Sequence, residues 1–315
     1  MAKKNKEEPY YITPEKINEL LIKGVPIAQE ITLQEQVRAM IKEMIPQSII
    51  DQAKLMGTDI EGLLFKLVQE RQSGSYAFNR ERTVSLLAGI VGNALAKKHF
   101  ESQGCKVEEE VDILEEGSTR KKTSTDLVVT DKDGNITLIE VKTIPALITT
   151  PEEFPEKPFE IPDSVIENPP EGEEDKAQAL TPGIVLPRRS ITVNNFKGEE
   201  RSLPHIAVST AEKAKKQVEI NREYANSKEA VDGKKRNVAL CVFEGIKISP
   251  EIEEAITTHA DIIRLPINVD KVFDFCYDMV GAVVYQGRNI MHPSRGRTPM
   301  TYEERYNKEI DTLGL

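Results

Sequence analysis

The order of helix-like and strand-like segments predicts an α/β protein with a mixed central sheet flanked by helices. A long apolar helix pattern begins at Thr83, and three strand-like runs follow it, the last two separated by the turn residues Asp133-Gly134. A second helix pattern begins at Ser209 and precedes two further apolar runs, 237–243 and 261–269. Helix, three strands, helix and two strands in this order are typical of helices that cover the faces of one sheet.

The composition excludes several classes of protein. The chain has 315 residues, 30% charged and 39% hydrophobic, a profile typical of a soluble globular protein. It has no apolar run long enough to span a bilayer, and its first residues lack the apolar core of a secretory signal. We therefore expect no membrane contact. Its three cysteines have no metal-like spacing, so we expect reduced thiols in a cytoplasmic protein. A net charge of −10 indicates that any DNA contact is local.

Residues 1–75 are predicted to form a helical N-terminal region with a disordered tail. The segment Thr32-Leu33-Gln34-Glu35 has the pattern of a capping box and predicts a helix that begins there. Short amphipathic helices are predicted at 48–56 and 58–72. The stretch RQSGSYAFNR, residues 71–80, predicts a linker or irregular loop before the α/β core.

The α/β core is predicted to span residues 79–266, with an insertion at 144–204. The insertion contains ten of the chain's eighteen prolines, together with acidic residues. Proline lacks a backbone donor and fixes φ, so we expect residues 151–180 to form neither regular helix nor strand. Residues 267–315 are predicted to form a helical C-terminal extension, with helices near 269–284 and 301–312.

Three charged residues interrupt the apolar hairpin 124–143. Asp126 lies at the start of one run, while Glu140 and Lys142 lie within the other. Residues two apart on a strand share a face, so the side chains of Glu140 and Lys142 point the same way. An exposed edge hairpin, in which charges keep the strand soluble, explains this pattern as an alternative to an active site.

The register of the hairpin decides whether Asp126 joins the other two charges. A two-residue loop at Asp133-Gly134 sets Asp126 opposite Val141, on the wrong face. A three-residue loop from Asp133 to Asn135 sets it opposite Lys142, and one bulge would have the same effect. We therefore predict an odd-length loop or one bulge, which brings two carboxylates close enough to share a cation.

Asp126 at the start of one strand and Glu140-Val141-Lys142 on the next resemble the PD-(D/E)XK nuclease superfamily. That family has the order of elements predicted for residues 83–266, in a restriction-endonuclease-like core. The resemblance implies a DNA endonuclease dependent on Mg²⁺ or Mn²⁺, with Asp126, Glu140 and Lys142 as catalytic residues. It further implies that Asp126, Glu140 and the main-chain carbonyl of Val141 bind the metal.

These residue types suit phosphodiester hydrolysis. Two neighbouring carboxylates hold a hard divalent cation, which activates water and neutralises charge on the phosphate. A neighbouring ammonium, as a compact point charge, can orient the water or stabilise the transition state.

Other residues are possible auxiliaries of this site. Asn93 lies where many members of the family place a metal-binding Glu on the first helix, and its amide oxygen can still bind metal. Lys213 and Gln217 can share one face of the second helix, where family members place auxiliary polar residues. Arg288, Arg295 and Arg297 lie in or beside a basic loop that can contact phosphates or a protein partner.

A second class of function remains open: a non-catalytic assembly protein that keeps a nuclease-like core as a scaffold. The acidic net charge, Asn93 and the proline-rich insertion favour the scaffold. The three charges that converge on one sheet favour the enzyme. DNA is the expected partner of the enzyme, while the insertion and the terminal extensions are expected to contact proteins or a second copy of the chain.

Overall fold

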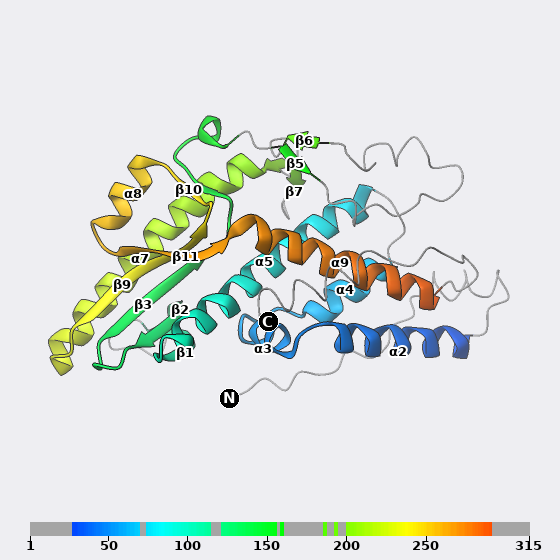
Figure 1. Cartoon of the computed structure of the whole chain (residues 1–315), viewed down its shortest axis with the longest axis horizontal. Helices are drawn as coiled ribbons and strands as arrows, with labels where there is room; N and C mark the ends of the chain where they lie inside the picture. The colour runs from blue at the N-terminus through cyan, green and yellow to red at the C-terminus, as the bar shows by residue number, and fades with distance from the viewer. Residues whose placement is uncertain are drawn as a thin grey trace.

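The computed structural model describes residues 27–69, 74–114, 121–155, 158–160, 185–187, 192–194 and 200–291. A five-stranded sheet in the order β1-β2-β3-β9-β11 lies at its centre (Figure 1). Strand β2 is antiparallel to both neighbours, whereas β3, β9 and β11 are parallel, so the predicted mixed α/β sheet is confirmed. The strands are β1 (Lys106–Leu114), β2 (Lys121–Thr130), β3 (Ile136–Lys142), β9 (Arg236–Glu244) and β11 (Asp261–Asn268).

Helices cover both faces of this sheet (Figure 1). On one side, α7 (Leu203–Asp232) crosses from β3 to β9, and α8 (Pro250–Thr257) crosses from β9 to β11. Parallel strands require such crossovers, and a strand covered on both faces reads as a continuous apolar run. Strand β9 fits this rule, because its six residues 238–243 are all buried.

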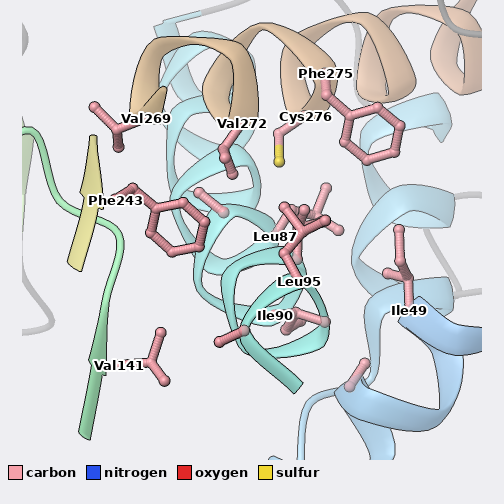
Figure 2. Close-up of a cluster of buried hydrophobic side chains, with 14 of the residues drawn as sticks. Ile49, Leu87, Ile90, Leu95, Val141, Phe243, Val269, Val272, Phe275 and Cys276 are labelled. Atoms are coloured by element: carbon pink, nitrogen blue, oxygen red, sulfur yellow. The ribbon is translucent and has the colours of Figure 1, made fainter. Parts of the chain in front are cut away.

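The other side of the sheet carries a helical layer. It consists of α2 (Ile27–Met44), α3 (Gln47–Leu55), α4 (Ile60–Gln69), α5 (Gly74–Ser102) and α9 (Val269–Met291). Figure 2 shows Phe243 of the sheet facing Val272 of α9 and the apolar side chains of α5. The helices and the sheet contribute to one cluster of buried hydrophobic side chains. The helices expected near 48–56, 58–72 and 269–284 are confirmed as α3, α4 and α9, and the domain boundaries stay predictions.

Two local predictions in the N-terminal half are wrong. Helix α2 begins at Ile27, so the capping-box sequence at Thr32 lies inside a helix. The residues before it, Ile27 to Ile31, contain Ala, Gln and Glu, which favour helix and extend it. The expected loop at 71–80 is helical from Gly74 onward, as the first turns of α5.

Polar contacts explain why α5 extends so far. The side chain of Arg80 is buried and donates to Glu81, which also accepts a hydrogen bond from the hydroxyl of Tyr277 on α9. Within the helix, Thr83 Oγ1 donates to the carbonyl of Asn79 at 2.8 Å. Packing against a distant helix therefore outweighs the weak local propensity of this stretch.

The insertion contains short elements where none was expected. The prediction for 151–180 is wrong at a 3₁₀ turn, η1 (Pro151–Glu153), and at β5 (Pro158–Glu160), while 161–180 lie outside the described residues. Among the described strands, β5 pairs with β6 (Val185–Pro187) alone, and a two-stranded ladder tolerates proline because its outer edges need no donor. The remaining elements are β4 (Ala146–Leu147), which pairs with β10 (Lys247–Ile248), and β7 (Thr192–Asn194), which pairs with β8 (Glu200–Ser202).

Several expectations fall on parts of the chain that the structure does not describe. They are the N-terminal tail, the helix expected at 301–312, and the loop residues Arg295 and Arg297. Among the helices that are described, none has both the length and the apolar character needed to cross a membrane.

Close contact between α5 and the sheet gives a testable prediction about two glycines. A Cβ added at Gly92 would lie 2.0 Å from Thr143 Cγ2 and 3.4 Å from Phe243 Cε2, whereas a Cβ at Gly89 would meet nothing within 4 Å. Gly92→Ala should therefore lower the free energy of unfolding by about 1–3 kcal/mol through overpacking. Gly89→Ala, the matched control, should raise it by up to about 1 kcal/mol through helix propensity. Urea unfolding measures both, and equal effects would contradict the close approach.

Candidate active site

The hairpin between β2 and β3 has the odd-length loop that the sequence predicts. Thr130 pairs with Ile136, and the backbone N–H of Asp131 donates to the carbonyl of Asn135 at 3.0 Å. The loop therefore has three residues, 132–134, and begins one position earlier than the predicted loop, 133–135. Asp131 causes this shift, because its Oδ1 accepts hydrogen bonds from the backbone N–H groups of Asp133 at 2.9 Å and Asn135 at 2.8 Å.

The resulting register aligns the charged residues of the two strands. Leu127 and Ile139 form the last pair of this ladder. Asp126 and Glu140 are the next residues on the two neighbouring strands, so they lie opposite each other. Beyond the Leu127–Ile139 pair, side chains replace backbone groups as hydrogen-bond partners. Asp126 Oδ2 accepts a hydrogen bond from the backbone N–H of Val141 at 2.7 Å. The Asp126 carboxylate is therefore held against the segment that carries the other two charges.

Thr125 stabilises the same junction from the residue before Asp126. Its hydroxyl donates to the carbonyl of Ile139 at 3.1 Å and accepts a hydrogen bond from Asn221 Nδ2 at 3.2 Å. Thr125 and Asn221 are both fully buried. A buried hydrogen-bonded pair of this kind fixes α7 relative to β2, because leaving either partner unsatisfied is costly.

Lys142 makes close contacts with both other residues of the Glu-x-Lys sequence. Its Nζ donates to Glu140 Oε1 in a short ion pair and lies 3.3 Å from the carbonyl oxygen of Val141. The side chains of Glu140 and Lys142 are only 9% and 18% exposed. Figure 2 shows Val141 pointing toward α5, so its neighbours Glu140 and Lys142 point to the opposite face.

Burial and neighbouring charge shift the pKa values of this pair. The pKa of Glu140 is raised from its ordinary 4.5 to about 7, chiefly by burial; the attraction of Lys142 opposes this rise, while the negative charges of Asp126 and Glu110 add to it. Burial lowers the pKa of Lys142, but Glu140 and Asp126 outweigh this effect, and the net pKa is raised. The ammonium therefore stays charged at neutral pH, among more carboxylates than it can neutralise.

Glu110 of β1 is a member of this site that the sequence analysis missed. The register of β1 and β2 pairs Glu109 with Leu127 and Val111 with Thr125, which sets Glu110 opposite Asp126. Glu110 has a φ of 47°, uncommon for a residue other than glycine. Ser124 Oγ donates to Glu110 Oε2 at 3.1 Å.

Nothing in the sequence singles Glu110 out, because it is the last of three consecutive glutamates, 108–110. Only the cross-strand register identifies it. Ser124, Thr125 and Asn221 were likewise missed, since each acts through contacts that the sequence does not reveal.

The proposed auxiliary residues lie at different distances from this cluster. Gln217 Nε2 donates to the carbonyl of Ser124 at 2.9 Å and to Asn221 Oδ1 at 3.2 Å, so it borders the site. Lys213 is exposed one turn earlier on α7. Asn93 is directed elsewhere, because its Nδ2 lies 3.7 Å from Met56 Sδ, beside the helical layer. Arg288 lies in the last turn of α9.

The chemistry of the donor groups limits which cation could bind. Asp126, Glu140 and the carbonyl of Val141 offer only oxygen atoms, the ligands of Mg²⁺ and Mn²⁺. Within the described part of the chain, no three His, Cys, Asp or Glu side chains are arranged to hold a metal ion. With two carboxylates and one carbonyl as donors, this set would leave a Mg²⁺ ion most of its own waters. No protein-family model, curated protein or solved structure matches this chain.

The raised pKa of Glu140 gives a prediction about pH. Between about pH 4.5 and about pH 7, Glu140 should be protonated in a larger fraction of folded molecules than of unfolded ones. The contribution of Glu140 to the free energy of unfolding should therefore fall as pH rises through this window. Glu110→Gln removes a like charge and should lower the pKa of Glu140, as followed by ¹³C NMR of its carboxyl. Glu108→Gln, exposed on the same strand, is the control, and an equal shift in both variants would contradict the proximity of Glu110.

Proposed function

We propose that this chain is a metal-dependent phosphodiesterase, most specifically a DNA endonuclease with a restriction-endonuclease-like core. The observation that carries the proposal is the convergence of three charges where β2 and β3 meet. Asp126 accepts the Val141 N–H, and Lys142 contacts Glu140 in the same segment. The order α5, β1, β2, β3, α7, β9 also supports it, because the resemblance to PD-(D/E)XK nucleases implies this order.

The residues divide the work of hydrolysis as follows. Asp126, Glu140 and the Val141 carbonyl would hold Mg²⁺ or Mn²⁺; such a cation, when bound, lowers the pKa of water and neutralises charge on the phosphate. Lys142 supplies a positive charge that orients the attacking water or stabilises the transition state. Burial excludes competing solvent around the pair, so each of these charges acts more strongly than it would in water.

A scaffold function is the second candidate. Two observations favour it: the net charge of −10, and the direction of Asn93, whose amide contacts Met56 and not the site. A scaffold would keep the sheet and its helices while losing the chemistry. Protein partners or a second copy of the chain would then be the ligands.

Nuclease assays separate the two candidates. Supercoiled plasmid, linear duplex, single-stranded DNA and RNA are incubated with metal-free protein, and Mg²⁺ or Mn²⁺ is then added. The proposal predicts cation-dependent cleavage of DNA by the wild type and none by Lys142→Ala. Absence of cleavage of every substrate, with both cations, would favour the scaffold.

A further inference from the structure

The contacts of Lys142 carry an inference that rests on the proposed function. The Lys142 ammonium lies against Glu140 Oε1 and 3.3 Å from the Val141 carbonyl oxygen. These are two of the three groups that the proposal assigns to the divalent cation. The third, Asp126, also acts on Lys142 electrostatically and favours its charged form. Lys142 therefore occupies, with a single positive charge, the position that a cation would need.

An ammonium and a divalent cation compete for these ligands. Two positive charges a few ångströms apart in a buried site repel each other strongly. A lysine side chain is flexible, so its ammonium can leave without a change in the backbone. In the metal-free protein Lys142 supplies a counter-charge to the Glu140 carboxylate, whose ionised form would be costly to bury without a partner.

We propose that Lys142 is a built-in competitor for the cation: it holds Glu140 and the Val141 carbonyl in the metal-free protein and releases both when a divalent cation binds. Release frees the ammonium to serve the reacting phosphate. One side chain thus keeps the metal-free site neutralised and acts in the reaction only after the cation has arrived. Cation affinity is thereby weakened in exchange for a lysine positioned within the site.

The first test measures binding and does not depend on cleavage. Calorimetry with Ca²⁺ and Mn²⁺ compares the wild type with Lys142→Met, and Lys132→Gln, in the exposed loop of the same hairpin, controls for the loss of one positive charge outside the cluster. The inference predicts about 10-fold tighter binding in Lys142→Met, a change of the size that residues around a metal cause, and little change in Lys132→Gln. Equal or weaker binding in Lys142→Met than in the wild type would overturn it.

The second test uses the wild type, so it remains decisive if Lys142→Met fails to fold. Amine acetylation followed by mass spectrometry reports how accessible each lysine is. Saturating Ca²⁺ should increase the labelling rate of Lys142 several-fold and leave unchanged that of Lys97, which lies on α5 and pairs with Glu109 of β1. Unchanged labelling of Lys142 when bound Ca²⁺ is detected would overturn the inference.

The two proposals fail in different ways. Cation binding with release of Lys142, but without cleavage of any nucleic acid, would contradict the nuclease function and leave the competition intact. Cation-dependent cleavage with no change at Lys142 would support the nuclease function and contradict the competition. Absence of cation binding in both the wild type and Lys142→Met would overturn both.

Discussion

Asp126→Asn should lower the rate of DNA cleavage by about 10³-fold while leaving the fold intact. The substitution removes the negative charge that a cation requires, a loss of several kcal/mol, and each 1.36 kcal/mol of barrier is about tenfold in rate. The Asn oxygen can still accept the hydrogen bond from the Val141 N–H, so the junction of β2 and β3 is preserved. Single-turnover cleavage at saturating Mg²⁺, together with circular dichroism, measures the two effects separately.

Asp133→Asn is the matched control for this substitution. Asp133 lies in the loop of the same hairpin and is exposed, so its neutralisation should leave the cleavage rate unchanged. An equal loss of activity in both variants would indicate a general electrostatic effect. A fully active Asp126→Asn variant would show that the Asp126 carboxylate takes no part in the reaction.

Phe243→Ala should lower the free energy of unfolding by about 3–5 kcal/mol, the range for deleting a buried aromatic side chain. Phe243 is fully buried at the end of β9, where Figure 2 shows it between the sheet and the helices α5 and α9. It is therefore one of the side chains that join the sheet to the helical layer. Urea unfolding followed by fluorescence and circular dichroism should give one coincident transition at lower urea.

Val231→Ala is the control for Phe243→Ala. Val231 is 83% exposed near the end of α7, so its truncation should change stability by no more than about 0.5 kcal/mol. Two separate transitions in the Phe243→Ala variant would contradict a shared core and would favour independent units for the sheet and the helical layer.

The sheet could be predicted because its strands carry strong local signals. Buried β9 reads as a continuous apolar run, and the hairpin turn contains Gly134, whose φ of 83° few other residues adopt. Helix boundaries were harder, because tertiary contacts decide them. Arg80 ends the stretch 71–80 that local sequence marks as a loop, and it donates to Glu81, which also accepts a hydrogen bond from Tyr277 of α9.

Some residues of the candidate site could likewise be found from local sequence, whereas others depend on tertiary contacts. Asp126, Glu140 and Lys142 could be found by their spacing. Glu140 and Lys142 are two residues apart on one strand, and a loop with an odd number of residues places Asp126 on the same face of the sheet. Glu110 could not, because its position depends on how a third strand aligns with β2. The direction of Asn93 depends on which helix packs beside it, which no local pattern specifies.

The most direct test of the central claim is the Mg²⁺ dependence of cleavage by protein first stripped of metal with EDTA. The measurement is the single-turnover rate on an end-labelled DNA duplex, as Mg²⁺ is added back to the wild type and to Asp126→Asn. The account predicts no cleavage without the cation, a rate that saturates with Mg²⁺ in the wild type, and almost none in Asp126→Asn. Cleavage that persists in EDTA, or that Asp126→Asn retains in full, would contradict a metal-dependent site at the junction of β2 and β3.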